Sequence, residues 1–188
     1  MLNEGVVKYF ANELQLINDK QVREPAEALL GLAPEYFLKI PSSTTGKYHP
    51  IDENCEGGKA IHVKRVVWLV HELCAMDASS SLEHDLAIAA ALVHDLFFKD
   101  IPEQKHSVDY HPGLIRKYTA EASSALPHYA DIVAIAERHS GRWEKNPELR
   151  PQQKLMLDKM LHIADYVASR RPVHISISNA IAPNPKKG

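Results

Sequence analysis

The sequence predicts an all-α fold in which a bundle of helices surrounds a metal site. Three observations support this prediction. Apolar residues recur at helical spacing along most of the 188-residue chain. Glycine and proline interrupt these segments where helices would end. Six histidine and aspartate residues fall on successive predicted helices, and side chains from facing helices build metal sites in helical bundles.

The first part of the chain is expected to hold two helices and a long loop. Residues 6–17 carry apolar side chains at helical spacing. Residues 25–32 form a short predicted helix with Pro25 near its start, where proline is tolerated. Residues 39–58 contain two prolines, three glycines and four consecutive serines and threonines, which predicts a loop. A loop of this length in a compact domain is often functional.

Two long helices are expected in the middle of the chain. The first covers residues 59–76 and follows Gly57-Gly58. Its apolar residues share one face of the helix; they are Val63, Val66, Val67, Val70 and Leu73. The second begins after the candidate N-cap residues 79–81 and continues to about Phe98.

The remaining helices are expected to be shorter, apart from the last. His111-Pro112 begins one of them, because proline suits the first turn of a helix. Residues 128–139 form the next, and Gly141 ends it. Residues 152–170 form the last long helix. Residues 173–177 alternate like a strand, but the sequence offers no strand to pair with them.

The composition is that of one globular domain. Hydrophobic residues make up 45% of the chain and charged residues 24%, so a sizeable core can be buried. We expect residues 1–182 to form a single domain and residues 183–188 to be a disordered tail. The net charge of −2 provides no overall attraction to nucleic acid or to an anionic membrane. The sequence does not determine an oligomeric state.

Two features predict a cytoplasmic protein with no membrane association. No apolar run approaches the roughly 20 residues that a membrane span requires. The first ten residues lack the apolar core of a signal peptide. Cys55 and Cys74 are then expected to be free thiols, as in a reducing compartment.

Six residues form the candidate metal site. They are His62, the adjacent pair His94-Asp95, His111, His139 and Asp165. Imidazoles and carboxylates bind Mn²⁺, Fe²⁺, Ni²⁺, Co²⁺ or Zn²⁺ without the help of cysteine. The pair His94-Asp95 ends a strongly apolar run, where burying charged groups is costly unless they bind a partner such as a metal ion. A lone helical histidine is more often a surface or core residue, so the set as a whole carries the prediction.

In their order and on helices, His62, His94-Asp95 and Asp165 resemble the HD superfamily of metal-dependent phosphohydrolases over roughly residues 57–171. The segment around Asp165 is similar to the last-aspartate helix of small phage-type members. His111, which precedes a proline, and His139 match additional histidines of the two-metal branches. These branches include cyclic-dinucleotide phosphodiesterases, CRISPR-associated HD nucleases and HD exoribonucleases.

The resemblance implies an HD-domain helical bundle with two divalent ions bridged by Asp95, and catalytic roles for His94 and Asp95. Two ions roughly 3.5–4 Å apart can clamp the attacking and leaving oxygens of an in-line displacement at phosphorus. The implied activity is hydrolysis of a phosphoester or phosphodiester in a nucleotide or oligonucleotide by metal-activated water. Many two-metal members carry a lysine four residues after the central histidine, where this chain has Phe98.

Several polar and aromatic residues near the ligands are candidates for binding the substrate. They are Lys47, His49, Arg65, Lys99, Arg142 and Trp143. The first two lie in the predicted loop, where a basic residue and a histidine could meet a phosphate. Trp143 could stack on a base, and the arginines could bind phosphate. A solvated loop, a surface ion pair or a core position explains each of them equally well. A solvated helix end is expected for Arg170 and Arg171.

Three other functions share these ligands. A one-metal nucleotidase or deoxynucleotide triphosphohydrolase needs only His62, His94, Asp95 and Asp165. An HD-type di-iron oxygenase uses the same ligand types, so the motif does not exclude it. A binding module with a degenerate site is a third possibility, against which the intact ligand set argues.

Overall fold

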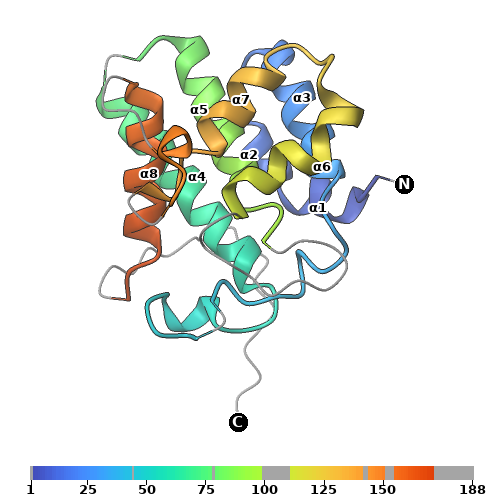
Figure 1. Ribbon diagram of the computed structural model, residues 1–188. Helices are drawn as coiled ribbons and strands as arrows, with labels where there is room; N and C mark the ends of the chain where they lie inside the picture. The colour runs from blue at the N-terminus through green and yellow to red at the C-terminus, as the bar shows by residue number, and fades with distance from the viewer. Residues whose placement is uncertain are drawn as a thin grey trace.

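The computed structural model describes residues 2–43, 45–77, 79–98, 111–141, 144–150 and 155–171. These residues form eight α-helices with short 3₁₀ helices and no strand between them, which confirms the predicted all-α fold (Figure 1). The α-helices are α1 (Glu4–Tyr9), α2 (Ala11–Leu14), α3 (Lys20–Gly31), α4 (Gly58–Met76), α5 (Ser81–Val93), α6 (Leu114–Ser123), α7 (Tyr129–Ala136) and α8 (Met156–Ala168). The 3₁₀ helices are η1 (Ile51–Glu53), η2 (His111–Gly113) and η4 (Pro147–Leu149).

The N-terminal helices differ from the prediction in two ways. The helix expected over residues 6–17 is divided into α1 and α2 at Phe10, whose side chain is fully buried. The helix expected to begin at Pro25 begins at Lys20 instead. Asp19 explains the earlier start, because its carboxylate caps the helix by accepting a hydrogen bond from the Gln21 amide at 2.8 Å. Pro25 therefore lies inside α3, where its ring is buried.

Helix α4 is the centre of the bundle and packs against α5 and α8. Its bounds agree closely with the prediction. The predicted apolar face is confirmed, since Val63, Val66, Val67 and Val70 are fully buried. The N-terminal half is buried on its other sides as well, including charged and polar side chains, and this was not expected of an amphipathic helix.

Helix α5 starts as predicted and ends early. Ser80 caps it in a reciprocal arrangement with Glu83, so the expected N-cap is confirmed. The helix ends at Val93 instead of about Phe98. The ring of His94 explains this end, because its Nδ1 donates to the carbonyl of Ala91 at 2.8 Å and satisfies an acceptor of the last turn. The chain then turns, and the pair His94-Asp95 lies just beyond the helix.

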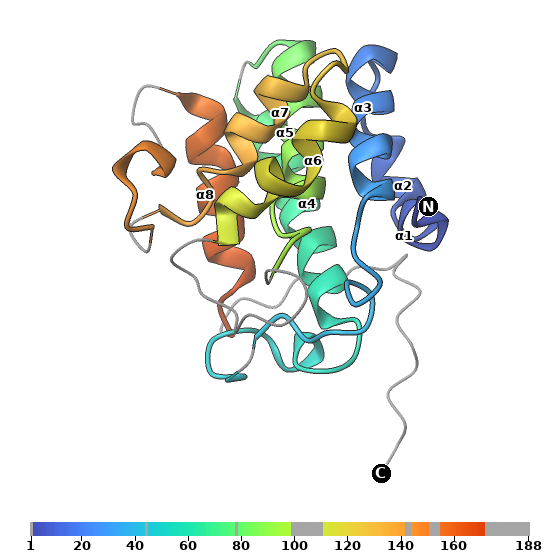
Figure 2. The same ribbon diagram turned by 45° about the vertical axis from the view of Figure 1, so that its right-hand side comes forward.

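The segment between α3 and α4 passes around the N-terminal end of α4, as both views show (Figures 1 and 2). It is irregular except for η1, which confirms the predicted loop. Helices α5, α7 and α8 contact one another on another side of α4. The strand-like residues 173–177 and the tail 183–188 lie outside the described residues. None of the described helices is both long and apolar enough to cross a membrane.

Candidate metal centre

Five separate elements bring the six predicted ligands together. His62 lies on α4, the pair His94-Asp95 follows α5, and Asp165 lies on α8. His111 begins η2, and His139 follows the end of α7. All the imidazoles are buried, which is unusual for histidine and is consistent with a shared role at the centre of the bundle.

Three ligand atoms from three elements form the first cluster. His62 Nε2 lies 3.0 Å from Asp165 Oδ1, and His94 Nε2 lies 4.0 Å from the same oxygen. Asp95 faces this cluster with Oδ2, which is 3.8 Å from His62 Nε2 and 3.6 Å from His94 Nε2. Atoms that bind one ion at about 2.0–2.2 Å lie roughly 3–3.5 Å apart, so these separations are close to those of a metal site.

The second cluster uses the other oxygen of the same carboxylate. Asp95 Oδ1 is 3.1 Å from His111 Nε2 and 3.5 Å from His139 Nε2. The two histidine nitrogens are 3.0 Å apart. Asp95 therefore lies between two groups of potential ligands and directs one oxygen at each of them.

Hydrogen bonds hold two of the histidines in the form that metals bind. His139 Nδ1 donates to the carbonyl of Ala136 at 2.7 Å, as His94 Nδ1 does to Ala91. The lone pair of each Nε2 must then face the clusters, and His94 Nε2 is buried with no hydrogen-bond partner. Burial lowers the pKa of His94, and burial with the neighbouring imidazoles lowers the pKa of His139 to about 3. Both rings are neutral near pH 7, as metal binding requires.

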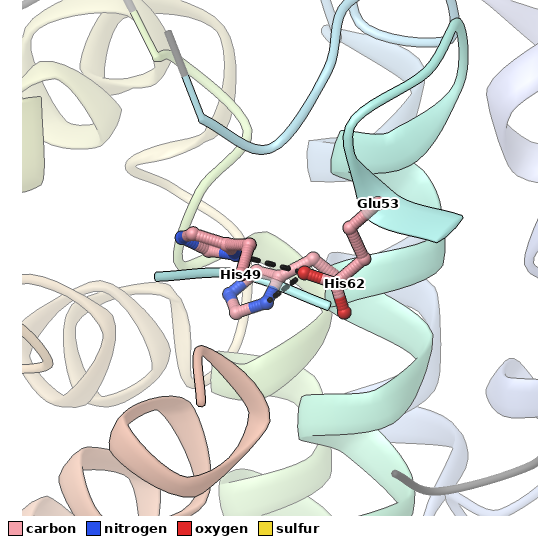
Figure 3. A group of neighbouring side chains, drawn as sticks. All are labelled: His49, Glu53 and His62. Carbon is pink, nitrogen blue, oxygen red and sulfur yellow. Dashed lines mark hydrogen bonds and ion pairs between the residues drawn. The ribbon is translucent and has the colours of Figure 1, made fainter. Parts of the chain in front are cut away.

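Glu53 supports His62 from the loop (Figure 3). Its Oε2 accepts a hydrogen bond from His49 Nδ1 at 2.8 Å and lies 3.4 Å from His62 Nδ1. Its Oε1 pairs with Arg65, which also pairs with Asp52. Because the guanidinium neutralises Glu53, we interpret these residues as support for His62 and not as a third metal site. A carboxylate behind a metal-binding histidine orients the ring and makes it a better ligand.

The pKa of His62 reflects this support. Burial lowers it, but the charge of Glu53 at 3.4 Å and the hydrogen bond to Asp165 outweigh burial and raise the pKa to about 9. Burial raises the pKa of Glu53, but His62, His49 and Arg65 hold it well below its usual range. Glu53 was missed in the sequence, where its spacing of four residues from His49 was the available signal.

Lys59 is the second residue that the sequence analysis missed. Its side chain is only 2% exposed, and Nζ lies 2.7 Å from Asp95 Oδ2 and 4.0 Å from the centre of the Phe98 ring. The lysine expected from the resemblance at residue 98 is absent, but Lys59 places an ammonium group over the phenylalanine that stands there. Its charge, with a hydrogen bond from His111, overcomes the effect of burial and holds the pKa of Asp95 well below its usual range.

His162 supports the second cluster. Its Nδ1 donates to the backbone carbonyl of His139 at 2.7 Å. The ring lies against Gly141, where an added Cβ would come within 2.0 Å of it. Gly141 has a φ of +61°, so this glycine both turns the chain after α7 and leaves room for the ring.

The clusters open into a pocket of about 650 Å³, a size typical of small-ligand sites. Among the predicted substrate residues, His49 lines this pocket, whereas Lys47 and Arg65 do not. Lys47 is exposed beside the Tyr48 ring, and Arg65 is buried in its ion pairs with Glu53 and Asp52. The geometry therefore gives no support to a substrate role for these two residues. Lys99, Arg142 and Trp143 lie outside the described residues.

Comparison with known protein families agrees with this geometry. The model of the HD domain family matches residues 60–170, which is more than half of the chain. The chain belongs to the HD domain family. Searches of curated proteins and of solved structures give no significant match.

The HD domain assignment confirms the resemblance seen in the sequence. The matched range contains all six predicted ligands, and the buried histidine and aspartate clusters are consistent with an HD metal site. Family and clusters together indicate a metal-dependent phosphohydrolase. The loop that carries His49 and Glu53, together with Lys59, precedes the matched range.

Proposed function

We propose that this protein hydrolyses a phosphodiester of a nucleotide or oligonucleotide and holds two divalent metal ions. The observation that carries the proposal is the position of Asp95, with Oδ2 toward one cluster and Oδ1 toward the other. A carboxylate that directs one oxygen at each of two ligand groups is suited to bridging two ions. Two-metal HD branches favour phosphodiester cleavage over phosphatase action.

The ligands divide naturally between the two ions. His62, His94 and Asp165 would hold the first, His111 and His139 the second, and Asp95 both. The bound ions would act as Lewis acids that activate water for attack on phosphorus and stabilise the leaving oxygen.

Protein groups around the ions assist in two ways. Lys59 provides a positive charge beside Asp95 in the pocket wall, where it would stabilise negative charge that develops on a phosphoryl group held by the ions. Glu53 and the carbonyls of Ala91 and Ala136 orient three of the imidazoles, so that little reorganisation is needed when ions and substrate bind.

A metal-by-substrate screen tests the activity. Protein loaded with Mn²⁺, Co²⁺, Ni²⁺, Zn²⁺ or Fe²⁺ is assayed against nucleoside mono- and triphosphates, cyclic dinucleotides and short oligonucleotides. We expect phosphodiester cleavage with at least one metal. Release of phosphate from mononucleotides alone would indicate a nucleotidase. Near-stoichiometric iron with O₂ consumption and no phosphoesterase activity would replace the proposal with the di-iron oxygenase.

Elemental analysis of variants tests the number of ions separately. We expect His111→Ala and His139→Ala each to lose one ion per chain while retaining the fold, and Asp95→Ala to lose both. His128→Asn is the matched control, because His128 pairs with Asp131 outside the pocket and asparagine tolerates its φ of 53°. One ion in the wild-type protein, unchanged in His111→Ala and His139→Ala, would contradict the two-ion site.

A further inference from the structure

The pocket has two chemically different ends. The metal-ligand clusters, with both acidic residues that line the pocket, form one end. Arg170, Tyr48 and Tyr166 lie further along α8 and the loop, and also line the pocket. Sequence reasoning placed Arg170 at a solvated helix end, but its side chain is half-buried in the pocket wall.

Two tyrosine rings hold the guanidinium of Arg170. Its Cζ lies 4.0 Å from the centre of the Tyr166 ring and 5.7 Å from that of Tyr48. The amide of Arg171 donates to the Tyr48 carbonyl at 2.8 Å, which ties the loop to the end of α8. Contact with aromatic rings restrains a guanidinium while its N–H groups at the edge stay available for a bidentate acceptor.

Arg170 lines the pocket and has no acidic partner among the described residues. Arg65 pairs with Glu53 and Asp52, Arg116 with Glu137, and Arg138 with Asp158. None of the ion pairs within the described part of the chain includes Arg170, and its Nε is buried without a hydrogen-bond partner. An unneutralised guanidinium in a pocket wall is suited to an anionic ligand.

We propose that Arg170, held between Tyr48 and Tyr166, binds a second phosphate group of the substrate, one that is not hydrolysed. Arg170 follows the candidate ligand Asp165 by five positions, just beyond the end of α8 at Ala168, which corresponds to roughly 7.5 Å of helical rise. A phosphate one nucleotide away from the scissile phosphorus would reach this position. The inference rests on the proposed phosphodiesterase activity, and it specifies substrates that carry a further phosphate beside the cleaved one.

Calorimetric binding tests this subsite without relying on turnover. The Mn²⁺-loaded protein is titrated with thymidine 5′-monophosphate and with thymidine 3′,5′-bisphosphate. A charge-assisted bidentate contact should make the bisphosphate bind about tenfold more tightly or better. Arg170→Gln should abolish this preference and leave binding of the monophosphate unchanged. Arg171→Gln is the matched control, because its exposed side chain does not line the pocket while its backbone amide still holds Tyr48.

Three results would overturn the subsite. The first is equal affinity of the wild-type protein for both ligands. The second is a preference for the bisphosphate that persists in Arg170→Gln. The third is an equal loss of affinity for both ligands in that variant. The last would indicate base stacking and not phosphate binding. Metal content and thermal melting of Arg170→Gln should match the wild type, which shows that the variant folds.

Cleavage assays separate this inference from the proposed function. The dinucleotide TpT is compared with pTpTp, which carries terminal phosphates on both sides of the scissile bond. If neither is cleaved but the bisphosphate preference persists, the proposed activity fails and the subsite stands. If both are cleaved equally well and Arg170→Gln cleaves them at the wild-type rate, the subsite fails and the activity stands.

Discussion

At the scale of single residues, the main finding is that buried cations are used in two different ways. Lys59 and Lys64 lie five residues apart on α4, and both are almost completely buried. Lys59 pairs with Asp95 in the pocket, whereas Lys64 pairs with Glu13 at 2.6 Å on the side of α2. Burying an ammonium group is costly, so each needs its carboxylate. Only Lys59 is in a position to meet a substrate.

We predict that Lys59→Met lowers kcat/KM by about 10²–10³-fold while the ion content stays unchanged. The reason is that the variant removes a positive charge beside the reacting phosphoryl group but leaves the six ligands in place. Steady-state kinetics and elemental analysis measure the two effects. Lys64→Met is the control, since it should lower the free energy of unfolding and leave kcat close to the wild-type value. An unchanged kcat/KM in Lys59→Met would restrict Lys59 to a structural role.

We predict that Gly141→Ala destabilises the protein by about 2 kcal/mol. Alanine is strained at a φ of +61°, and its Cβ would displace the His162 ring that holds the His139 carbonyl. Urea unfolding measures the loss, and weaker binding of one ion should accompany it. Gly113→Ala should be nearly neutral, because the nearest atom, Leu149 Cδ1, is 3.7 Å from the added Cβ. A similar loss in both variants would contradict this account.

At the scale of elements, the loop before α4 is part of the site. Helix α4 begins against η1 so closely that a Cβ on Gly58 would lie 1.9 Å from the carbonyl oxygen of Glu53. Ser42 anchors the backbone of this segment. Its amide donates to the backbone carbonyl of Glu53 at 3.0 Å, and its hydroxyl donates to the backbone carbonyl of Gly58 at 2.7 Å. The close approach allows Glu53 to reach His62 one turn into the helix.

We therefore predict that Gly58→Ala weakens metal binding through the loop. The added methyl group must push η1 away from α4, which separates Glu53 from His62. We expect about tenfold lower metal affinity, the lower end of the range for loss of an outer partner, together with a lower free energy of unfolding. Metal titration and urea unfolding measure the two quantities. Gly5→Ala is the control, because it lies on α1, where only Asn3 Oδ1 is near, at 3.4 Å. Wild-type metal affinity in Gly58→Ala would show that Glu53 does not support His62.

At the scale of the whole molecule, metal binding is expected to be coupled to stability. The clusters join residues from α4, α8 and the ends of α5 and α7, so ions that bind them tie the bundle together. An ion present at 100 times its dissociation constant should stabilise the folded state by about 2.7 kcal/mol. Thermal unfolding with and without EDTA measures this effect. An unchanged melting temperature, with elemental analysis showing bound metal, would contradict it.

We also predict that the metal-free protein is most stable near pH 6.5. The pKa of His139 is about 3 in the folded state, so its contribution is present above the unfolded value of about 6.5 and is lost as the pH falls toward 3. The pKa of His62 is about 9, so its contribution is present below about 6.5 and is lost as the pH rises through 9.

Urea unfolding in EDTA between pH 5 and pH 9 measures how the free energy of unfolding changes with pH on the acid side and on the alkaline side of pH 6.5. The unfolded pKa of histidine, about 6.5, lies inside this range, so the shifted histidines dominate both slopes. His139→Gln should flatten the acid side, and His62→Gln the alkaline side. An acid slope that is unchanged in His139→Gln would contradict the assignment.

The sequence by itself determined the fold class and pointed to the candidate ligand set. Helical spacing and the glycine and proline breaks are local properties, so the long helix after Gly57-Gly58 was predicted almost to the residue. The errors in the predicted helix bounds also had local causes. For example, the Asp19 cap makes α3 begin at Lys20 and not at Pro25. The resemblance to the family follows from the order of residues along the chain, with His62 before the pair His94-Asp95 and Asp165 after it.

Only the tertiary structure decided which other residues belong to the site. Lys59 meets Asp95 across 36 positions of sequence. Arg170 meets Tyr48 only where the loop reaches the end of α8. Lys47 was a candidate phosphate ligand and Lys59 was not, yet Lys47 is exposed outside the pocket and Lys59 is buried within it. The physical reason is that helical periodicity sets which side of its own element a side chain occupies, whereas its partners depend on how the elements pack.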